Sequence, residues 1–346
     1  RYRAHAPVQA AAYGIVKHMA RSQTTGEYDA KSHPRGKNTP IQTASVLLGK
    51  KNIRFGKAIA EQFRQRGART RVLNLSARKY PDRVLEKSAR ANAVFFTAND
   101  SDKHLERPAE IVVDSVEKRY KTKSGSRMAL LYGMTPQAVR EVLSQNTKRM
   151  RRFTQKTFDA VQGAKRIHVK TPAGTDLVFD LTPKHRWVQD NGVLSKNYWG
   201  NLPAGEVFTS PASVNGNLVI DGVMYGVGML NKTPLTVKIV NGRVDPNSIR
   251  CQNPVFRERL LKIIKFDANA SRIGELGLGT NVGVTKLTGN DLVDEKYVGV
   301  HVAVGDALSA DTGATWTSEE HRDAVLRKPT IFVDGRCIMR NGKSLL

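Results

Sequence analysis

The sequence predicts a mixed α/β protein in two parts: a Rossmann-like α/β domain over residues 44–165 and a mixed, largely antiparallel α+β domain over residues 166–346. Short apolar runs alternate with helical stretches in the first part, and strand-length segments separated by tight-turn dipeptides fill the second. The chain has 346 residues, of which 40% are hydrophobic, so it can bury the cores of two domains.

The first part follows an N-terminal extension and linker, residues 1–43, which is rich in Ser, Thr, Gly, Pro and charge over 21–40. Apolar runs predict strands at 45–49, 71–75, 93–97 and 128–132. Helices are expected at 52–66, 81–90 and 107–118, and from 135 towards 164. This alternation favours a parallel sheet with helices on its faces. Neither G-x-G-x-x-G nor a P-loop string is present, so nothing indicates a nucleotide.

The second part has the pattern of antiparallel strands. Residues 166–170 and 176–180 flank Thr-Pro-Ala-Gly-Thr, which predicts a hairpin. Further strands are expected at 217–220, 235–240, 298–304 and 330–333, and one clear helix at 254–265. Asn-Gly and Asp-Gly dipeptides at 241–242, 334–335 and 341–342 predict tight turns between strands.

Positive charge is concentrated in the first half of the chain. The whole sequence has 56 Lys and Arg against 31 Asp and Glu, a net charge of +25. Residues 1–165 hold 34 basic and 13 acidic residues, net +21, whereas 166–346 hold 22 and 18, net +4. Such a field favours polyanions, such as nucleic acid or acidic peptides. A heavily charged, solvated surface without such a partner is the alternative, since no nucleic-acid motif accompanies the charge.

Two further features of the sequence indicate where in the cell the protein is expected. No stretch approaches the roughly 18 unbroken apolar residues of a spanning helix, so no membrane association is expected. Cys251 and Cys337 are the two cysteines, too few for a disulfide framework or a zinc–thiolate site. The low cysteine content fits a reducing compartment, and we expect a cytoplasmic location.

Two histidines and an aspartate in the second half could bind a metal ion. His321 and Asp323 are two residues apart, so in an extended segment their side chains point the same way. His301 lies inside the apolar strand Gly299-Val-His-Val-Ala-Val-Gly305, where it is either a core histidine or a ligand. Two imidazoles and one carboxylate suit zinc, iron(II), cobalt or manganese.

Two glutamates stand in unexpectedly apolar, turn-rich segments. Glu206 lies in Asn201-Leu-Pro-Ala-Gly-Glu-Val-Phe208 and Glu275 in Ile273-Gly-Glu-Leu-Gly-Leu-Gly-Thr-Asn281. A carboxylate among apolar neighbours is costly to bury unless a positive group, such as a metal ion, pairs with it. The glycine-rich string is no phosphate loop, because it carries an acid where backbone N–H groups and a cation are needed.

Three further motifs accompany these residues: Thr-Pro-Ala-Gly-Thr-Asp176, Asp294-Glu-Lys296 and Val-Asp-Gly335. Together, over residues 171–346, the motifs resemble those of the aminopeptidase T and aminopeptidase S family of dinuclear metallo-aminopeptidases. The resemblance is strongest to the shorter, leucyl aminopeptidase-like relatives in this family. The 2,5-dihydroxypyridine dioxygenases share this fold. The resemblance implies metal ligands at Glu206, Glu275, His301, His321 and Asp323. One or two divalent ions (Zn, Co or Mn) would be bound in a peptidase. In a dioxygenase, Fe(II) would be held by the two histidines and the aspartate alone.

The sequence departs from the peptidase pattern at two places. Many peptidases of the family have an acid, a candidate general base, immediately before the first glutamate, where this chain has Gly205. The segment between His301 and His321 is short and lacks the family's aromatic residue. Asp306 and Glu320 could substitute as bases or be solvated loop acids, so the catalytic base is left unassigned.

Two residues are predicted to bind substrate. His104 follows the third predicted strand, and loops after strand ends line ligand clefts in doubly wound sheets; the alternative is a surface histidine. Lys296 could pair with an anionic group of the substrate or with a ligand carboxylate, or form a structural salt bridge.

Three functions remain open on the sequence. The first is a metal-dependent hydrolase that cleaves an amide or peptide bond with metal-activated water. The second is a mononuclear non-heme iron ring-cleaving dioxygenase of the dihydroxypyridine type. The third is a non-catalytic module that binds an acidic peptide or nucleic acid. The expected partners are a small peptide or small-molecule substrate and a second copy of the chain in a homodimer.

Overall fold

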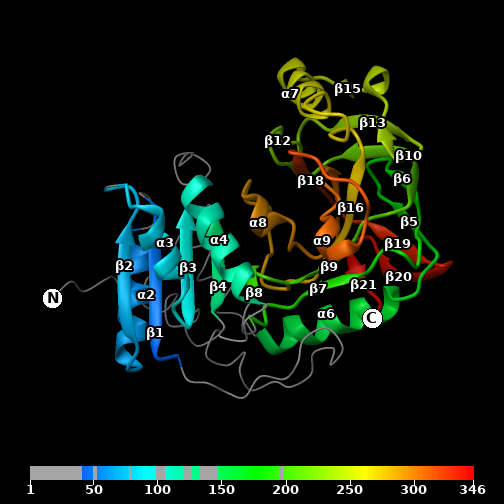
Figure 1. Cartoon of the computed structure of the whole chain (residues 1–346). Helices are drawn as coiled ribbons and strands as arrows, with labels where there is room; N and C mark the ends of the chain where they lie inside the picture. Colours follow the sequence, from blue (N-terminus) through cyan, green and yellow to red (C-terminus); the bar gives the residue numbers. More distant parts are fainter. Residues whose placement is uncertain are drawn as a thin grey trace. The chain divides into compact units, whose positions relative to one another are not determined.

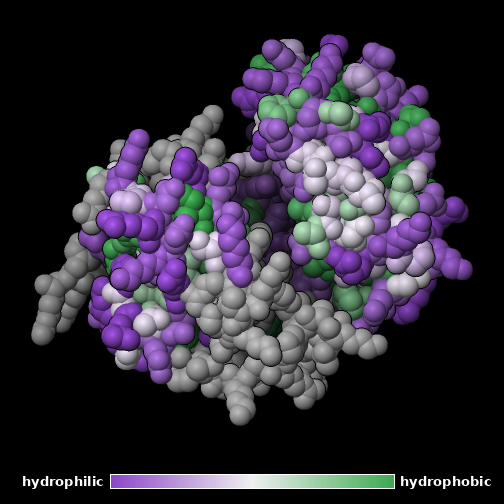
Figure 2. Space-filling view, in the orientation of Figure 1, coloured by the Kyte–Doolittle hydropathy of each residue, from purple (hydrophilic) through white to green (hydrophobic). Residues whose placement is uncertain are grey.

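The computed structural model describes residues 41–49, 53–77, 79–98, 106–120, 126–132, 147–194 and 198–346. The chain forms two units (Figure 1). Unit 1 comprises Arg1–Thr147 and Gly192–Ala204, and unit 2 comprises Lys148–Asn191 and Gly205–Leu346. The chain therefore passes from one unit to the other three times. Figure 2 shows hydrophilic side chains over most of the visible face of each unit, with small apolar patches between them.

Unit 1 is built on a parallel sheet with strand order β2-β1-β3-β4-β8. Its strands are β1 (Thr43–Leu48), β2 (Arg69–Asn74), β3 (Ala93–Ala98), β4 (Arg127–Tyr132) and β8 (Tyr198–Asn201). Its helices are α2 (Ile53–Gln65), α3 (Asp82–Ala89) and α4 (Glu106–Tyr120). The predicted alternation of strands and helices is observed. The fifth strand, β8, comes from a segment more than 60 residues further along the chain and was not predicted.

Helices cover both faces of this sheet. Phe96 of β3 lies in one cluster with Leu85 of α3 and Val112 of α4. The adjacent Phe95 instead faces Phe63 of α2, with ring centroids 5.8 Å apart. Because successive side chains of a strand point to opposite faces, α2 lies on one side of the sheet and α3 and α4 on the other. Burial on both faces explains why these strands are continuous apolar runs in the sequence.

Unit 2 contains two antiparallel sheets. The first has the order β14-β13-β10-β6-β5-β19-β20-β21, with β15 also paired to β13: β5 (Arg166–Lys170), β6 (Asp176–Asp180), β10 (Ser213–Ile220), β13 (Leu235–Val240), β14 (Arg243–Val244), β15 (Arg250–Cys251), β19 (Thr330–Val333), β20 (Arg336–Arg340) and β21 (Lys343–Ser344). The second has the order β12-β11-β18-β17-β16-β9-β7: β7 (Val188–Asp190), β9 (Glu206–Thr209), β11 (Val223–Met224), β12 (Gly228–Met229), β16 (Ile273–Gly279), β17 (Val300–Gly305) and β18 (His321–Leu326).

The predicted hairpin is the antiparallel pair β5–β6, and the predicted strands at 217–220, 235–240, 298–304 and 330–333 fall in β10, β13, β17 and β19. The helices of unit 2 are α6 (Thr147–Val161), α7 (Pro254–Ile264), α8 (Asp291–Asp294) and α9 (Ser309–Thr312), with the 3₁₀ turn η3 (Pro246–Ser248). None of the helices in the described part of the chain is long and apolar enough to cross a membrane.

The core of unit 2 lies between its two sheets. One apolar cluster joins Val169 and Val237 of the first sheet to Leu276 and Val302 of the second, and α7 adds Leu260. In the first sheet, polar residues alternate with core residues. The central strands β16 and β17 are buried at every position. The second sheet must therefore also be covered on the face that points away from the apolar core.

Candidate metal centre

Strand alternation places the candidate ligands on one face of the second sheet. Core residues occupy alternate positions of each strand: Val207 in β9, Leu276 and Leu278 in β16, Val300, Val302 and Val304 in β17, and Ala324 and Leu326 in β18. Since neighbouring side chains point to opposite faces, the positions between them point away from the core. These positions are Glu206, Glu275, His301, His321 and Asp323, so four neighbouring strands deliver all five groups to one place.

A glycine on β16 provides the space for His301. Gly277 pairs directly with His301 across β16 and β17. A Cβ at position 277 would lie 1.9 Å from His301 Nε2. The pairing shifts register between Ile273 and Glu275, and such a β-bulge re-aims the side chains that follow it. The glycine-rich string is therefore a buried strand, and its glycine at 277 allows the imidazole to lie across the sheet surface.

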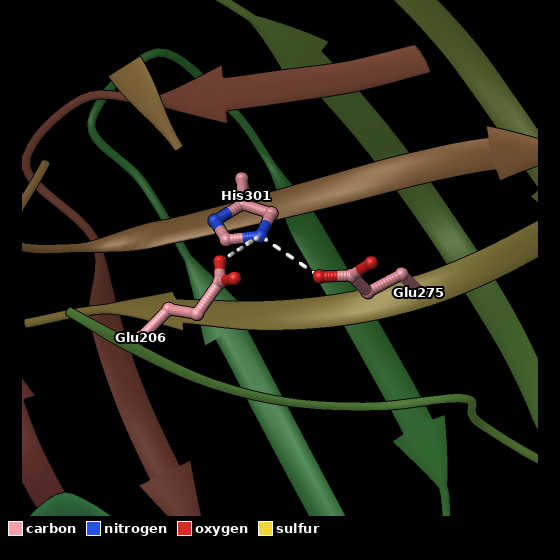
Figure 3. Close-up of side chains that lie close together, drawn as sticks. All are labelled: Glu206, Glu275 and His301. Atoms are coloured by element: carbon pink, nitrogen blue, oxygen red, sulfur yellow. Dashed lines mark hydrogen bonds and ion pairs between the residues drawn. The ribbon is translucent and has the colours of Figure 1, made fainter. Parts of the chain in front are cut away.

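His301 lies at the centre of the cluster (Figure 3). Its Nε2 is 3.0 Å from Glu275 Oε1 and 3.5 Å from Glu206 Oε2. His301, Glu275 and Glu206 are 1%, 3% and 7% exposed, so this contact is shielded from solvent. Asp323 Oδ1 is 3.8 Å from the same nitrogen. Three carboxylates therefore converge on one imidazole nitrogen.

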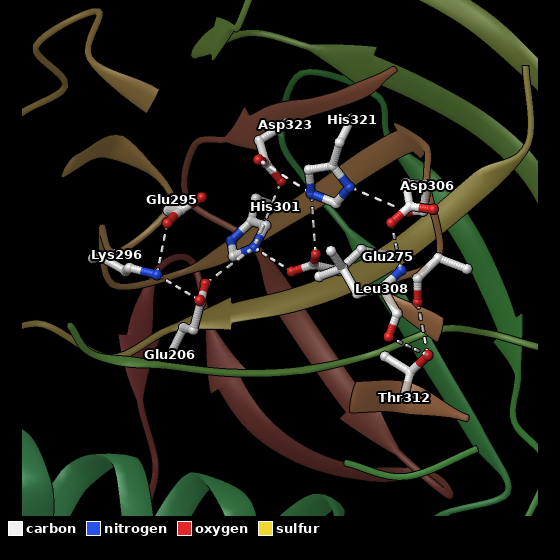
Figure 4. Close-up of polar contacts among 11 residues, drawn as sticks. Glu206, Glu275, Glu295, Lys296, His301, Asp306, Leu308, Thr312, His321 and Asp323 are labelled. Carbon is white, nitrogen blue, oxygen red and sulfur yellow. Dashed lines mark hydrogen bonds and ion pairs between the residues drawn. The ribbon is translucent and has the colours of Figure 1, made fainter. Parts of the chain in front are cut away.

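His321 completes the cluster on the other side of Glu275 (Figure 4). Its Nε2 is 3.3 Å from Glu275 Oε2 and 3.7 Å from Asp323 Oδ2. Its Nδ1 is 3.1 Å from the backbone carbonyl oxygen of Asp306. A carbonyl oxygen only accepts, so Nδ1 carries the hydrogen and Nε2 is directed at the carboxylates. A backbone acceptor on the second ring nitrogen is the usual way to orient a metal-binding histidine.

Several oxygens in this cluster have no hydrogen-bond partner. Among the described residues, Glu206 Oε2 and both carboxylate oxygens of Asp323 are buried and accept no hydrogen bond. A buried carboxylate oxygen without a partner is costly, and such atoms in a native fold need an explanation. Two imidazoles and three carboxylates are also the ligand types that zinc, manganese and iron prefer. A divalent cation between these groups fits both observations.

The pKa values in the metal-free cluster reflect this crowding. Burial raises the pKa of Glu206 to about 8, although Lys296 opposes the shift. Burial raises the pKa of Asp323 to about 6. Burial alone would lower the pKa of His301, but the hydrogen bond with Glu275 and the nearby charge of Asp323 outweigh it and raise the pKa to about 10. Without a metal, the cluster therefore retains protons at neutral pH.

Lys296 holds one oxygen of Glu206. Its side chain is fully buried, and its Nζ donates to Glu206 Oε1 and lies 2.6 Å from Glu295 Oε1 and 3.5 Å from Asp190 Oδ2. Of the roles predicted for Lys296, the observed contact is the one with a candidate ligand carboxylate. Glu206 thus presents Oε2 alone towards His301, as Figure 4 shows.

Position 205 has no room for the acid that many peptidases carry there. Gly205 has φ +120°, and a Cβ would lie 2.8 Å from Cβ of Asn281 and 3.1 Å from its backbone. The two acids suggested as substitutes both accept hydrogen bonds from neighbouring residues. The Asp306 carboxylate accepts hydrogen bonds from the backbone N–H groups of Leu308 and Ser318, and Glu320 accepts one from Arg322.

Three acids near the cluster were not singled out from the sequence. Asp291 and Glu295 each bring a carboxylate oxygen within 4.8 Å of Asp323, and Asp190 contacts Lys296. Asp291 and Glu295 are four residues apart around α8, so the helical repeat could have indicated that they share a face. Nothing local could have indicated Asp190. His104 lies outside the described residues.

The comparisons with known proteins identify the family of the chain. The model of the family described as thermophilic metalloprotease (M29) matches residues 140–336, more than half of the chain. The chain therefore belongs to the M29 family of metalloproteases. This confirms the family predicted from the motifs and, with it, a metal-dependent peptidase class of enzyme. No curated protein matches the chain in a sequence search.

Two solved structures share the fold. The 2,5-dihydroxypyridine dioxygenase from Pseudomonas putida KT2440 is similar with a TM-score of 0.71 and 17% identity, covering 99% of this chain and 98% of that one. Wild-type AmpT from Thermus thermophilus is similar with a TM-score of 0.65 and 16% identity, covering 99% of this chain and 100% of that one. At these identities the likeness establishes the fold alone.

Proposed function

We propose that the protein is an aminopeptidase-like hydrolase that cleaves the amide bond after the first residue of a small peptide, with metal ions held by Glu206, Glu275, His301, His321 and Asp323. One observation supports this above all. The donors form two sets, Glu206–Glu275–His301 and Glu275–His321–Asp323, and within each set the donor atoms lie within 4.8 Å of one another. The two sets share Glu275.

Glu275 suits a bridging role because its two oxygens face different histidines. Oε1 lies 3.0 Å from His301 and Oε2 lies 3.3 Å from His321. A carboxylate placed in this way can serve two ions at once, as in dinuclear hydrolases. Zinc, cobalt or manganese suits this mixture of imidazole and carboxylate donors. When bound, such ions polarise the substrate carbonyl and lower the pKa of a bound water.

The surrounding residues pre-organise these donors. Lys296 fixes Glu206 through its inner oxygen, the carbonyl of Asp306 fixes the ring of His321, and Gly277 leaves room for the ring of His301. Fixed donors cost less entropy on binding than mobile ones.

Substitution of the shared carboxylate tests this proposal. Glu275→Gln keeps the size of the side chain but removes the charge that two ions would share. We expect it to lower the metal content from two ions to one or none and to abolish hydrolysis of leucine p-nitroanilide. Glu258→Gln, the same change on the exposed surface of α7, should change neither. A Glu275→Gln protein with full metal content and activity would contradict the dinuclear assignment.

A mononuclear iron dioxygenase is a second candidate, and two observations favour it. Lys296 already provides a positive charge on Glu206, and position 205 cannot carry an acidic side chain. His301, His321 and Asp323 would then hold a single Fe(II), in the two-histidine, one-carboxylate pattern of non-heme iron oxygenases. The test is oxygen consumption with 2,5-dihydroxypyridine after anaerobic loading with Fe(II). Ring cleavage together with one ion per chain would replace the hydrolase proposal.

A further inference from the structure

A cavity of about 300 Å³ opens beside the metal centre in unit 2. The β11–β12 hairpin contributes the apolar residues Met224, Val227 and Met229, α7 contributes Arg259, and α8 contributes Asp291. The hairpin is joined directly to the metal centre, because the backbone N–H of Tyr225 donates to the carbonyl oxygen of Asp323. The volume is at the lower end of the range for ligand pockets and suits a single side chain.

Asp291 stands between this cavity and the metal centre. A carboxylate oxygen of Asp291 lies within 4.8 Å of oxygens of both Glu295 and Asp323. Glu295 pairs with Lys296, at 2.6 Å. Asp323 is 2% exposed, and neither of its oxygens accepts a hydrogen bond within the described ranges. The Asp291 carboxylate makes no hydrogen bond or ion pair with the described residues either. The inner end of the cavity thus holds a carboxylate, that of Asp291, which is available to accept hydrogen bonds from an ammonium group of a ligand.

The covalent geometry of a peptide fits this arrangement. In an N-terminal residue the ammonium nitrogen lies about 2.5 Å from the carbonyl carbon of the bond to be cleaved, because both are attached to the same Cα. A group that recognises the ammonium must therefore lie within a few ångströms of the atoms that hold the reacting carbonyl. Asp291 satisfies this condition because it lies close to Asp323. The side chain of the substrate's first residue, which is attached to the same Cα, can then enter the neighbouring cavity.

We propose that Asp291 binds the α-ammonium group of the substrate and that the cavity accepts the side chain of the substrate's first residue. This inference rests on the proposed hydrolase function and specifies its substrate class. The substrates are peptides with a free N-terminus and an apolar first residue of the size of leucine or methionine. Arg259 disfavours a first residue with a cationic side chain.

Steady-state kinetics tests the role of Asp291. Asp291→Asn keeps the size of the side chain and removes its charge. We expect KM for leucine p-nitroanilide to rise about tenfold while kcat changes less than threefold, because the lost contact holds ground state and transition state alike. Glu258→Gln on the exposed surface of α7 is the matched control and should change neither. An unchanged KM for Asp291→Asn would overturn the proposal.

A binding measurement separates this inference from the hydrolase proposal. 3-Methylbutan-1-amine carries the leucine side chain and an ammonium but no amide, and 3-methylbutan-1-ol is its neutral counterpart. By calorimetry, we expect the wild-type protein to bind the amine at least tenfold more tightly than the alcohol, and Asp291→Asn to lose this preference. Equal binding of the two by the wild type, or an unchanged preference in Asp291→Asn, would overturn the inference. An amine preference that depends on Asp291, in a protein that hydrolyses no amide, would support the site and contradict the hydrolase.

Discussion

Glu206 shows how a single residue links the fold to the site. One of its oxygens accepts a hydrogen bond from the buried Lys296, and the other is buried without a hydrogen bond and faces His301. The sequence indicated that Glu206 needed a positive partner. It also offered Lys296 as a partner for a ligand carboxylate, but it could not indicate which carboxylate, because Lys296 and Glu206 are 90 residues apart and meet only in the folded chain.

Removing the Lys296 ammonium should destabilise the protein. Lys296→Met leaves the carboxylates of Asp190, Glu206 and Glu295 around a neutral side chain in a buried site. Breaking a buried ion pair in this way costs about 3–5 kcal/mol. Denaturant unfolding should show a loss of this size. Lys262→Met, at an exposed position of α7, should change the free energy of unfolding by less than about 0.5 kcal/mol. Equal stability of the two variants would refute this role of Lys296.

Metal binding should release protons and strengthen as the pH rises. Contacts with carboxylates raise the pKa of His301 to about 10 in the metal-free protein, so its imidazole is protonated at neutral pH. A histidine must be neutral to bind a metal, so each ion displaces protons, and affinity grows as the pH approaches the folded pKa. By the same linkage, the stabilisation of the metal-free fold by protonated His301 is complete below about pH 6.5 and is lost as the pH rises through about 10. Calorimetry in buffers of different ionisation enthalpy measures the protons released. If no protons were released when the metal binds, this would be inconsistent with these pKa shifts.

At the level of elements, the site is a property of four adjacent strands. The alternation of core and non-core positions in β9, β16, β17 and β18 brings the donors together, although Glu206 and Asp323 are 117 residues apart in the sequence. The glycine-rich segment around Glu275 was predicted to be rich in turns, because glycine is common in turns. It forms a buried strand, since glycine is also required where another group lies across the backbone.

Gly277 provides a direct test of this packing. Gly277→Ala introduces a Cβ where His301 Nε2 now lies, so the ring must move away from Glu206 and Glu275. We expect metal content to fall at least tenfold under conditions in which circular dichroism still shows a folded protein. Gly163→Ala is the control, because a Cβ there meets nothing within 4 Å. It should lose stability at its φ of +78° but keep the metal. Retention of metal by Gly277→Ala would show that His301 is not needed.

Most elements of unit 1 and one hairpin of unit 2 could be located from the sequence, and several other strands could not. Strands β1 to β4 and helices α2 to α4 were located because apolar runs and helical periods alternate there. The hairpin β5–β6 was located because turn residues separate two strand-like segments. Strand β8 was missed because residues 198–201 join the parallel sheet through pairing with β4, which depends on how the distant chain segments meet rather than on local pattern. Strand β16 was missed because its glycines and its glutamate lower its apparent strand propensity, and β9 was missed because it is only four residues long and begins with a glutamate.

At the scale of the whole molecule, the net charge of +21 over residues 1–165 has no role in the proposed chemistry. We expect this excess to give weak binding of double-stranded DNA without sequence preference. Affinity should fall steeply between about 50 and 200 mM salt, as counterion release requires. Fluorescence anisotropy of a labelled duplex over this range measures the effect. Binding that does not respond to salt would exclude a purely electrostatic origin.

We propose above all that this chain is a metal-dependent amide hydrolase whose five donors hold the ions. The most direct measurement is titration of chelator-treated protein with zinc, cobalt or manganese while the hydrolysis of leucine p-nitroanilide is followed. We expect no activity in chelator and activity that rises and saturates at two ions per chain. Equal hydrolysis with and without chelator, or no hydrolysis at any metal loading, would contradict it.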